Sequence, residues 1–242
     1  MRIKDKINLD VHGLKEHGPI TIVALGDSVT HGAFESDVID PINVYHNRLK
    51  NKLISVRNYI PVNVINAGIG GTTAKCGLER LERQVLIHNP DLVTVCFGLN
   101  DVNNPISEYL DSLKGIFEKL LSKNIETIFV TPNMLNTSVN ENTQPCYFEY
   151  AKVTAQMQNE GKMDKYIYSA IDLAKSMGVK VADVYSIWKE LSKTTDVTTL
   201  LSNYINHPTR DMHEVFATEI FKCIFDGEVN ISTETSTTMF TK

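Results

Sequence analysis

Short apolar runs alternate along this chain with stretches in which apolar residues recur every three or four positions. Apolar runs bounded by glycine or proline are typical of buried strands, whereas the wider spacing is typical of helices with one buried face. The runs predict five strands, at residues 20–25, 61–65, 91–97, 125–131 and 179–184. The wider spacing predicts helices at residues 44–56, 74–88, 106–122, 162–177, 185–191 and 209–225.

The order of these elements predicts the fold class. Strands that alternate with helices form a parallel sheet with right-handed crossovers, which place helices on both faces. Because the chain shows no internal repeat and no linker, we expect one α/β domain of three layers (α/β/α) around a five-stranded parallel sheet. This domain is predicted to span residues 20–226, after an N-terminal arm (residues 1–19) and before a flexible tail rich in Ser and Thr (residues 227–242).

Two segments show neither pattern. Residues 133–158 are polar and have no clear period before Tyr147. Long loops of this kind often serve as lids or binding loops. Residues 192–206 are also predicted to be loop, and Thr209 is a suitable N-cap for the last predicted helix.

Composition and charge narrow the classes of partner. The chain has 242 residues, of which 42% are hydrophobic and 22% charged, which is ordinary for a globular domain with a sizeable core. The net charge is −5 and there is no long basic run, so nucleic acid and anionic membrane surfaces are not expected as main partners. The sequence leaves the oligomeric state open.

The cysteines and the apolar stretches bear on location. The four cysteines are far apart and form no CxxC motif; they are Cys76, Cys96, Cys146 and Cys223. We expect reduced, mostly buried thiols, a pattern that favours a cytoplasmic protein over a secreted one. No apolar stretch approaches the roughly 20 residues of a membrane-spanning helix. The N-terminus shows no signal peptide.

Small or polar residues follow the first three predicted strands. The first strand leads into Gly26-Asp27-Ser28, the second into Gly68–Gly71, and the third into Asn100. In a parallel sheet these turns lie at one edge, where α/β proteins bind ligands. A nucleophilic Ser28 would need a base, and donors for the oxyanion that it creates. The backbone amides of Ser28 and Gly71, with the side-chain amide of Asn100, would supply three donors.

His207 is the candidate base among seven histidines. It lies in a loop just before the last predicted helix, and Pro208 restricts its backbone. His213 is expected to pack at the start of that helix, and Asp27 and Asp101 are expected to brace their turns. The remaining histidines show no metal-binding spacing, so neither a metal nor an organic cofactor is expected; they are His12, His17, His31, His46 and His88.

Four sequence blocks in this order resemble the SGNH hydrolases, also called the GDSL esterase/lipase family. The blocks are Gly26-Asp27-Ser28, Asn66-Ala-Gly-Ile-Gly-Gly-Thr72, Gly98-Leu-Asn-Asp101, and His207-Pro208 with His213. The resemblance covers about residues 20–220 and implies a flavodoxin-like SGNH hydrolase fold. It also implies a serine esterase with Ser28 as nucleophile, His207 as base, and an oxyanion hole made by Ser28, Gly71 and Asn100.

One position departs from the family pattern. The family usually has an aspartate three residues before the histidine, and Tyr204 stands there in this chain. Three explanations follow. Another acid could reach the ring, with Asp183 and Asp196 as suggestions; a backbone carbonyl could orient the ring and leave a Ser–His dyad; or the enzyme could be weak or inactive. The third member of the triad is therefore unassigned, and a dyad or a substituted acid is favoured.

The substrate is predicted only as a class. The family resemblance covers carbohydrate O-acetyl esterases, short-chain lipases, lysophospholipases and thioesterases. The lack of an apolar lid, and the polar character of residues 133–158, favour a short acyl group such as acetyl on a polar carrier such as a carbohydrate. The alternatives are a lysophospholipase or thioesterase type of acyl hydrolase, or a catalytically impaired ligand-binding module on the same fold.

Overall fold

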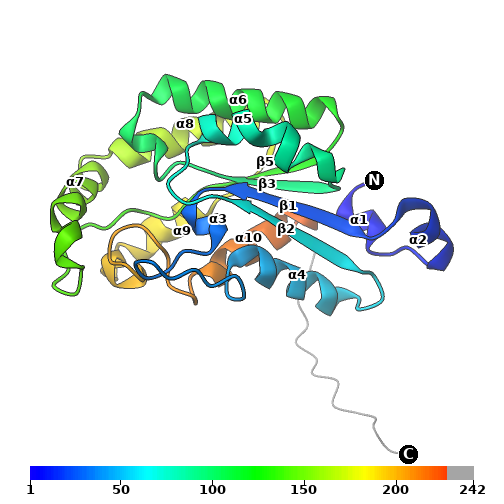
Figure 1. Ribbon diagram of the computed structural model, residues 1–242, viewed down its shortest axis with the longest axis horizontal. Coiled ribbons are helices and arrows are strands. Elements are labelled where there is room, and N and C mark those ends of the chain that lie inside the picture. The colour runs from blue at the N-terminus through cyan, green and yellow to red at the C-terminus, as the bar shows by residue number, and fades with distance from the viewer. Residues whose placement is uncertain (228–242) are drawn as a thin grey trace, which may run out of the picture.

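The centre of the computed structural model is a sheet of five parallel strands in the order β2-β1-β3-β4-β5 (Figure 1). The structure describes residues 1–227. The strands are β1 (Ile20–Gly26), β2 (Val62–Gly68), β3 (Leu92–Cys96), β4 (Glu126–Val130) and β5 (Lys180–Ala182). The predicted parallel sheet is thereby confirmed, and each strand lies within a few residues of its predicted position.

The strand register brings three turns to one edge of the sheet. Gly26 at the end of β1 pairs with Gly68 at the end of β2 and with Cys96 at the end of β3. The three strands therefore end level with one another. The turns that follow them carry Ser28, Gly71 and Asn100, so the pairing places these three residues at the same edge.

Helices cover both faces of the sheet, which confirms the three-layer architecture. In Figure 1, α5, α6 and α8 lie above the sheet and α4 and α10 lie below it. The longer helices are α4 (Tyr45–Val56), α5 (Ala74–Gln84), α6 (Ile106–Ser122), α8 (Lys162–Ser176), α9 (Val184–Leu191) and α10 (His213–Ile224). Because both faces are covered, every residue of β3 is buried.

The first nineteen residues hold two short helices, α1 (Ile3–Lys6) and α2 (Val11–His17). Ile3 and Ile7 are buried and belong to the main hydrophobic core. Lys6 donates to Asp91 at 2.8 Å, just before β3. Helix α1 is therefore fixed to the end of the sheet opposite the three turns. Apart from Gly227, the tail predicted at residues 227–242 lies outside the described residues.

A helix stands where the sequence predicts only loop. After a short 3₁₀ helix, η3 (Pro145–Tyr147), the chain forms α7 (Phe148–Asn159). Its buried positions are Ala151, Thr154, Ala155 and Gln158. Two of these are polar and two are alanine, so the apolar period that announces a helix is missing. The polar ones are satisfied instead by hydrogen bonds, such as Gln158 Oε1 accepting from the amide of Leu135.

The last helix begins later than predicted, at His213, and Met212 rather than Thr209 is its N-cap. The amide of Thr209 donates to the carbonyl of Leu200 at 2.9 Å, and Leu201 and Pro208 form an antiparallel bridge. Thr209 therefore belongs to this short pairing instead of being the N-cap, although its carbonyl accepts from the amide of His213 at 3.3 Å. The remaining short helices are α3 (Ser28–His31), η1 (Leu86–His88), η2 (Asp101–Asn103) and η4 (Val197–Leu200).

The cysteines are free but less buried than expected. Cys96 is buried, Cys76 and Cys223 are half-buried, and Cys146 is exposed. Among the helices of residues 1–227, none combines the length and the apolar composition required to cross a membrane.

Candidate active site

Ser28 is held where β1 gives way to α3. Asp27 is the N-cap of α3, and its Oδ1 accepts from the amide of Val29 at 3.0 Å. Ser28 is the first residue of this helix, a position whose N–H has no acceptor within the helix. Gly68 at the end of β2 allows α3 to pack closely, because a Cβ there would lie 2.3 Å from the amide nitrogen of His31.

His207 bonds to Ser28 through one ring nitrogen and to the backbone through the other. Its Nε2 lies 3.0 Å from Ser28 Oγ, and its Nδ1 lies 3.0 Å from the carbonyl oxygen of Phe34. A carbonyl oxygen can only accept, so the proton of the neutral ring is on Nδ1. Nε2 is then an acceptor aimed at the Ser28 hydroxyl.

The partner of His207 Nδ1 is a backbone carbonyl rather than an acid. Asp183 accepts from the amide and the hydroxyl of Ser186 at the start of α9, and Asp196 accepts from the amide of Thr198. Across residues 1–227, neither carboxylate hydrogen-bonds to His207. In the described part of the structure the partner of His207 Nδ1 is the Phe34 carbonyl, and neither suggested carboxylate bonds to the ring.

Asn203 fixes the backbone of the histidine loop, and sequence reasoning missed it. Its Oδ1 accepts from the amides of Ile205, Asn206 and His207 at 3.0–3.1 Å. Asparagine side chains often close turns in this way. The signal was therefore present in the sequence one residue before Tyr204, which itself adopts a left-handed backbone with φ 59°.

The predicted oxyanion donors lie around the same serine. Gly71 has φ +74°, which L side chains rarely adopt, and a Cβ there would project into open space. Asn100 donates through Nδ2 to the carbonyl of Thr72 at 2.9 Å, which fixes its amide plane and leaves a second N–H. Asp101 braces this region as expected, because its Oδ1 accepts from the amide of Ala74.

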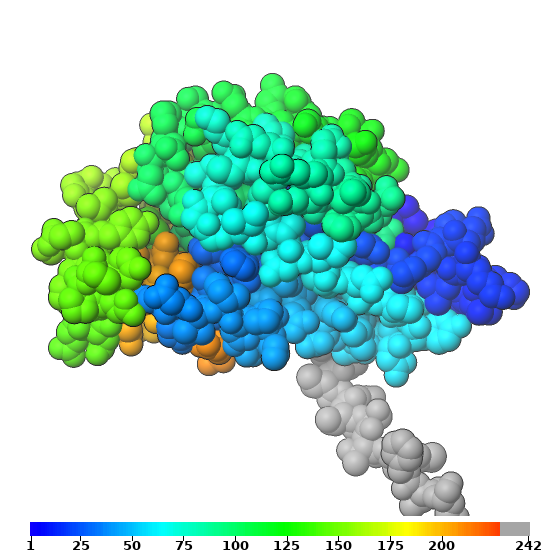
Figure 2. Space-filling view, in the orientation of Figure 1, coloured from blue at the N-terminus to red at the C-terminus, as the bar shows by residue number. Residues whose placement is uncertain are grey.

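One pocket of about 350 Å³ contains every site residue proposed from the sequence. These predicted site residues are Ser28, Gly71, Asn100 and His207. Three further segments line it, namely residues 33–39 after α3, Tyr147 and Tyr150 near the start of α7, and residues 203–206. In Figure 2 the blue, yellow-green and orange segments meet on one side of the molecule. The helix that the sequence did not predict therefore supplies one wall.

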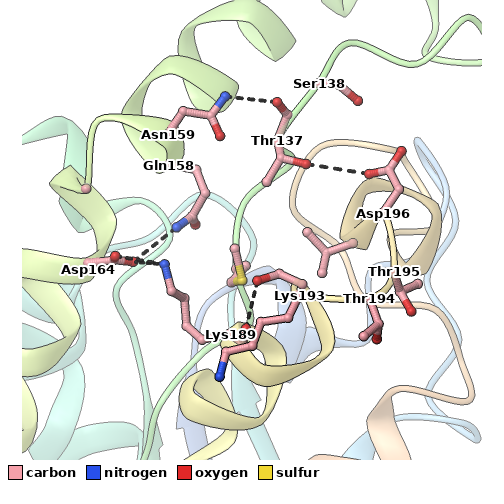
Figure 3. Close-up of a pocket in the computed structure, with 14 residues that line it drawn as sticks. Thr137, Ser138, Gln158, Asn159, Asp164, Lys189, Lys193, Thr194, Thr195 and Asp196 are labelled. Atoms are coloured by element: carbon pink, nitrogen blue, oxygen red, sulfur yellow. Dashed lines mark hydrogen bonds and ion pairs between the residues drawn. The ribbon is translucent and has the colours of Figure 1, made fainter.

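A larger hollow of about 660 Å³ lies elsewhere, between α7, α8 and the segment after α9 (Figure 3). It shares no lining residue with the Ser28 pocket. Its lysines are already paired, Lys189 with Asp164 at 2.8 Å and Lys193 with Glu190 at 2.6 Å. A choice of site by volume alone would select this hollow and not the smaller pocket that contains Ser28 and His207. Within residues 1–227 no group of three or more His, Cys, Asp or Glu side chains is placed to hold a metal ion.

Burial governs the electrostatics of the site. It lowers the pKa of His207 below the ordinary value of 6.5, against the opposing effect of the hydrogen bond to Phe34. Burial also raises the pKa of Asp27 to about 7 and lowers that of His213 to about 3. The ring of His213 is thus neutral where it packs 4.8 Å from the ring of Phe34, and its Nδ1 accepts from the amide of Tyr45.

A serine hydroxyl bonded to an imidazole, at the carboxyl edge of a parallel sheet, is characteristic of serine hydrolases on α/β folds. The profile of the GDSL-like Lipase/Acylhydrolase family matches residues 24–215. The chain therefore belongs to this family and is a carboxylic ester hydrolase, as its resemblance to the SGNH hydrolases implies.

Solved structures with the same fold include three esterases or hydrolases of low sequence identity. Acetylxylan esterase Axe2 from Geobacillus stearothermophilus is 21% identical with a TM-score of 0.65, covering 85% of this chain and 94% of its own. The lipase/acylhydrolase from Enterococcus faecalis is 22% identical with a TM-score of 0.64, covering 84% and 94%. LAE5, an alpha/beta hydrolase enzyme from the metagenome of Lake Arreo in Spain, is 19% identical with a TM-score of 0.67, covering 85% and 95%. A search of curated proteins gives no match.

Proposed function

We propose that this protein hydrolyses short-chain esters, acetyl esters above all, carried on a polar alcohol such as a carbohydrate. The observation that carries the proposal is the 3.0 Å contact between Ser28 Oγ and His207 Nε2. This pair opens into the pocket that also contains Gly71 and Asn100. Nucleophile, base and oxyanion donors therefore surround one position for a reacting carbonyl.

In the proposed mechanism, Ser28 Oγ attacks the acyl carbon while His207 Nε2 takes its proton. The amides of Ser28 and Gly71 and the side chain of Asn100 donate to the oxyanion of the tetrahedral intermediate. The proton on Nε2 then passes to the leaving alcohol, and an acyl-serine remains. Water attacks this ester as His207 takes its proton, and the acid is released with Ser28 restored.

The histidine works without a carboxylate in this scheme. The Phe34 carbonyl holds the Nδ1 proton and so selects the tautomer in which Nε2 is free to act as base. Its partial negative charge also favours the imidazolium that forms during the reaction, although less than a carboxylate would. An intact Ser–His contact argues against an impaired ligand-binding module, because such a module has no need of it.

The walls of the pocket favour a short acyl group and a polar carrier. A volume of about 350 Å³ is small for a ligand site. The pocket lining includes two tyrosines, Tyr147 and Tyr150, and two asparagines, Asn203 and Asn206. Such walls offer a flat apolar surface and hydrogen-bonding groups together, as a sugar ring requires. The solved acetylxylan esterase of the same fold agrees with this choice.

A second candidate, an acyl hydrolase of lipid-like or thioester substrates, is favoured by a different observation. Apolar side chains are exposed in the segments that form the pocket, with Ile39 at 47%, Ile69 at 40% and Tyr147 at 39% of their full exposure. A longer acyl chain could lie on them. Chain-length preference separates the two candidates.

The test of the proposed function is hydrolysis of p-nitrophenyl acetate, butyrate and octanoate, and of an acetylated xylo-oligosaccharide, by wild type and by Tyr147→Ala. We expect kcat/KM to fall from acetate to octanoate. Tyr147→Ala should raise KM for the acetylated sugar more than for p-nitrophenyl acetate. Tyr59→Ala, which removes an exposed tyrosine outside the pocket, is the matched control. A preference for octanoate would support the second candidate instead.

The acid limb of the pH profile is expected below the usual histidine range. His207 accepts a proton only when neutral, so activity rises as pH rises through its pKa. Because burial lowers that pKa below 6.5, kcat/KM should already be level at neutral pH. The measurement is kcat/KM for p-nitrophenyl acetate from acid to mildly alkaline pH. An inflection above neutrality would contradict the structure.

Asn100→Ala is expected to lower kcat about 10²- to 10³-fold, as the loss of an oxyanion donor does elsewhere. KM should change little, because the donor acts on the oxyanion rather than on the ground-state ester. Steady-state kinetics on p-nitrophenyl acetate measure both. Asn159→Ala, at the other pocket, is the matched control. If Asn100→Ala and Asn159→Ala lowered kcat by the same factor, Asn100 would not be an oxyanion donor.

The proposed location is cytoplasmic. All four cysteines are free in the structure, including the exposed Cys146. Free thiols persist in a reducing compartment, whereas secreted domains usually pair them. Fractionation of cells that express the full chain would test this location.

A further inference from the structure

The side chain of Arg210, three residues after His207, contacts the loop that supplies the Phe34 carbonyl. The guanidinium of Arg210 donates to both carboxylate oxygens of Glu35, at 2.7 and 3.1 Å, and through Nε to Asp40 Oδ2 at 3.0 Å. Its Cζ also lies 4.4 Å from the centroid of the Phe34 ring. An arginine fork that bonds two carboxylates and stacks on a ring has little freedom left.

The loop that Arg210 holds is closed at its base and exposed at its tip. The amide of Asp40 donates to the carbonyl of Gly32 at 2.8 Å, and the amide of Phe34 donates to the carbonyl of Val38 at 3.0 Å. The tip is open to solvent, since Val38 and Ile39 are 39% and 47% exposed. The start of the loop is anchored beside the nucleophile, because the amide of Ala33 donates to the carbonyl of Ser28 at 2.9 Å and the buried Phe34 ring packs on His213. Arg210 adds the contact that ties the rest of the loop, through Glu35 and Asp40, to the segment that carries His207.

The segment from His207 to Arg210 reaches this loop twice, once through the imidazole and once through the guanidinium. The segment itself is fixed, because the His207 carbonyl accepts from the amide of Ser202 at 2.7 Å and the Thr209 amide donates to Leu200. His207 and Arg210 are thus two residues of one fixed segment, and both contact the loop that carries Phe34. The contact made by Arg210 therefore helps to set the distance from His207 Nδ1 to the Phe34 carbonyl.

We propose that Arg210 is a positioning residue for His207: by clamping Glu35, Asp40 and the Phe34 ring, it holds the carbonyl that replaces the missing acid. This inference rests on the proposed esterase mechanism. A carboxylate attracts an imidazolium by charge and so contributes to its own alignment. A neutral carbonyl attracts it more weakly, so its placement has to come from the surrounding structure.

The clamp remains charged over the working pH range. The hydrogen bond from Arg210 lowers the pKa of Glu35. The side chain of Asn43 above all, with Arg210 adding to it, lowers the pKa of Asp40 to about 2. Both carboxylates are thus ionised at neutral pH, where His207 acts as the base.

The experiment compares Arg210→Gln and Arg210→Lys with wild type. Arg210→Gln should lower kcat roughly 10- to 100-fold, as small misplacements of reacting groups do, while KM stays within about threefold. Lysine keeps the charge but loses the fork, so Arg210→Lys should be intermediate. Lys189→Gln is the matched control, because it removes an ion pair of similar exposure at Asp164, outside the Ser28 pocket.

A second readout separates positioning from general support of the fold. NMR titration of the His207 ring gives its pKa without turnover. In Arg210→Lys, which keeps the positive charge beside Glu35 and Asp40, weakening of the Phe34 hydrogen bond should lower that pKa further, because this bond raises it. Phe34→Leu removes the stacked ring and keeps the carbonyl, so its effect on kcat should not add to that of Arg210→Gln.

Each outcome decides the matter. A folded Arg210→Gln protein with wild-type kcat and an unchanged His207 pKa overturns the proposal. A loss of activity that follows only a lower Tm, with the pKa unchanged, overturns it as well. If Arg210→Gln does not fold, Glu35→Gln carries the same two readouts. A wild type that cleaves no ester refutes the proposed function, while the pKa comparison still decides the role of Arg210.

Discussion

Ser28→Ala is expected to lower kcat for p-nitrophenyl acetate by roughly 10⁴- to 10⁶-fold, the scale seen when a hydrolase loses its nucleophile. The structure supplies the reason. Ser28 Oγ is the hydroxyl bonded to His207 Nε2, and no acyl-enzyme can form without it. Substrate binding should persist, because alanine leaves the amide of residue 28 and the donors of Gly71 and Asn100 in place.

The measurement combines steady-state kinetics with labelling by a fluorophosphonate, which modifies activated serines. Wild type should gain one label, located on Ser28 by peptide mass spectrometry, and Ser28→Ala should gain none. Ser55→Ala removes an exposed helix serine whose hydroxyl binds only the carbonyl of Lys52, and it serves as control. Appreciable residual activity in Ser28→Ala would mean that another group is the nucleophile.

His207→Ala is expected to have the second largest effect, a loss of kcat of about 10⁴-fold or more. Removing the ring leaves Ser28 as an ordinary hydroxyl without a base. Because the two groups act as one unit, the double variant Ser28→Ala/His207→Ala should be hardly worse than Ser28→Ala alone. Added imidazole should restore part of the activity of His207→Ala and none of that of Ser28→Ala.

The control is His88→Ala, an exposed histidine at the end of η1. It tests whether free imidazole or a general loss of histidine alters the assay. Near-wild-type activity of His207→Ala would exclude His207 as the base. It would also direct attention to the other histidines near the sheet edge.

The sheet and the reacting residues could be predicted because both leave local marks in the sequence. Strands β1 and β3 are almost wholly buried and read as apolar runs interrupted only by Thr21 and Thr94. Ser28, Gly71 and Asn100 follow such strands directly, so the parallel topology alone brings their turns together.

The missed features have physical causes. Helix α7 buries alanine and hydrogen-bonded polar side chains, so it has no apolar stripe. The sequence leaves a main-chain carbonyl open as the partner of His207 but does not single out Phe34, because every residue carries a carbonyl and no residue type marks it. Asp183 and Asp196 were suggested as acids, but each caps the helix that begins just after it. Each aspartate accepts from a backbone amide two or three residues further along the chain, and this capping bond occupies the carboxylate.

The use of a main-chain acceptor changes how this enzyme responds to mutation. No codon at position 34 can encode a residue without a carbonyl, so a single substitution cannot delete the partner of His207 in the way that replacing an aspartate would. Activity should therefore depend less on which residue stands at position 34 than on the number of residues in the loop that carries it. In a saturation library, bulky apolar residues should be accepted at position 34, where the ring packs on Arg210. Deletion of Ala33 should be null, because it moves the carbonyl of Phe34 out of register with His207.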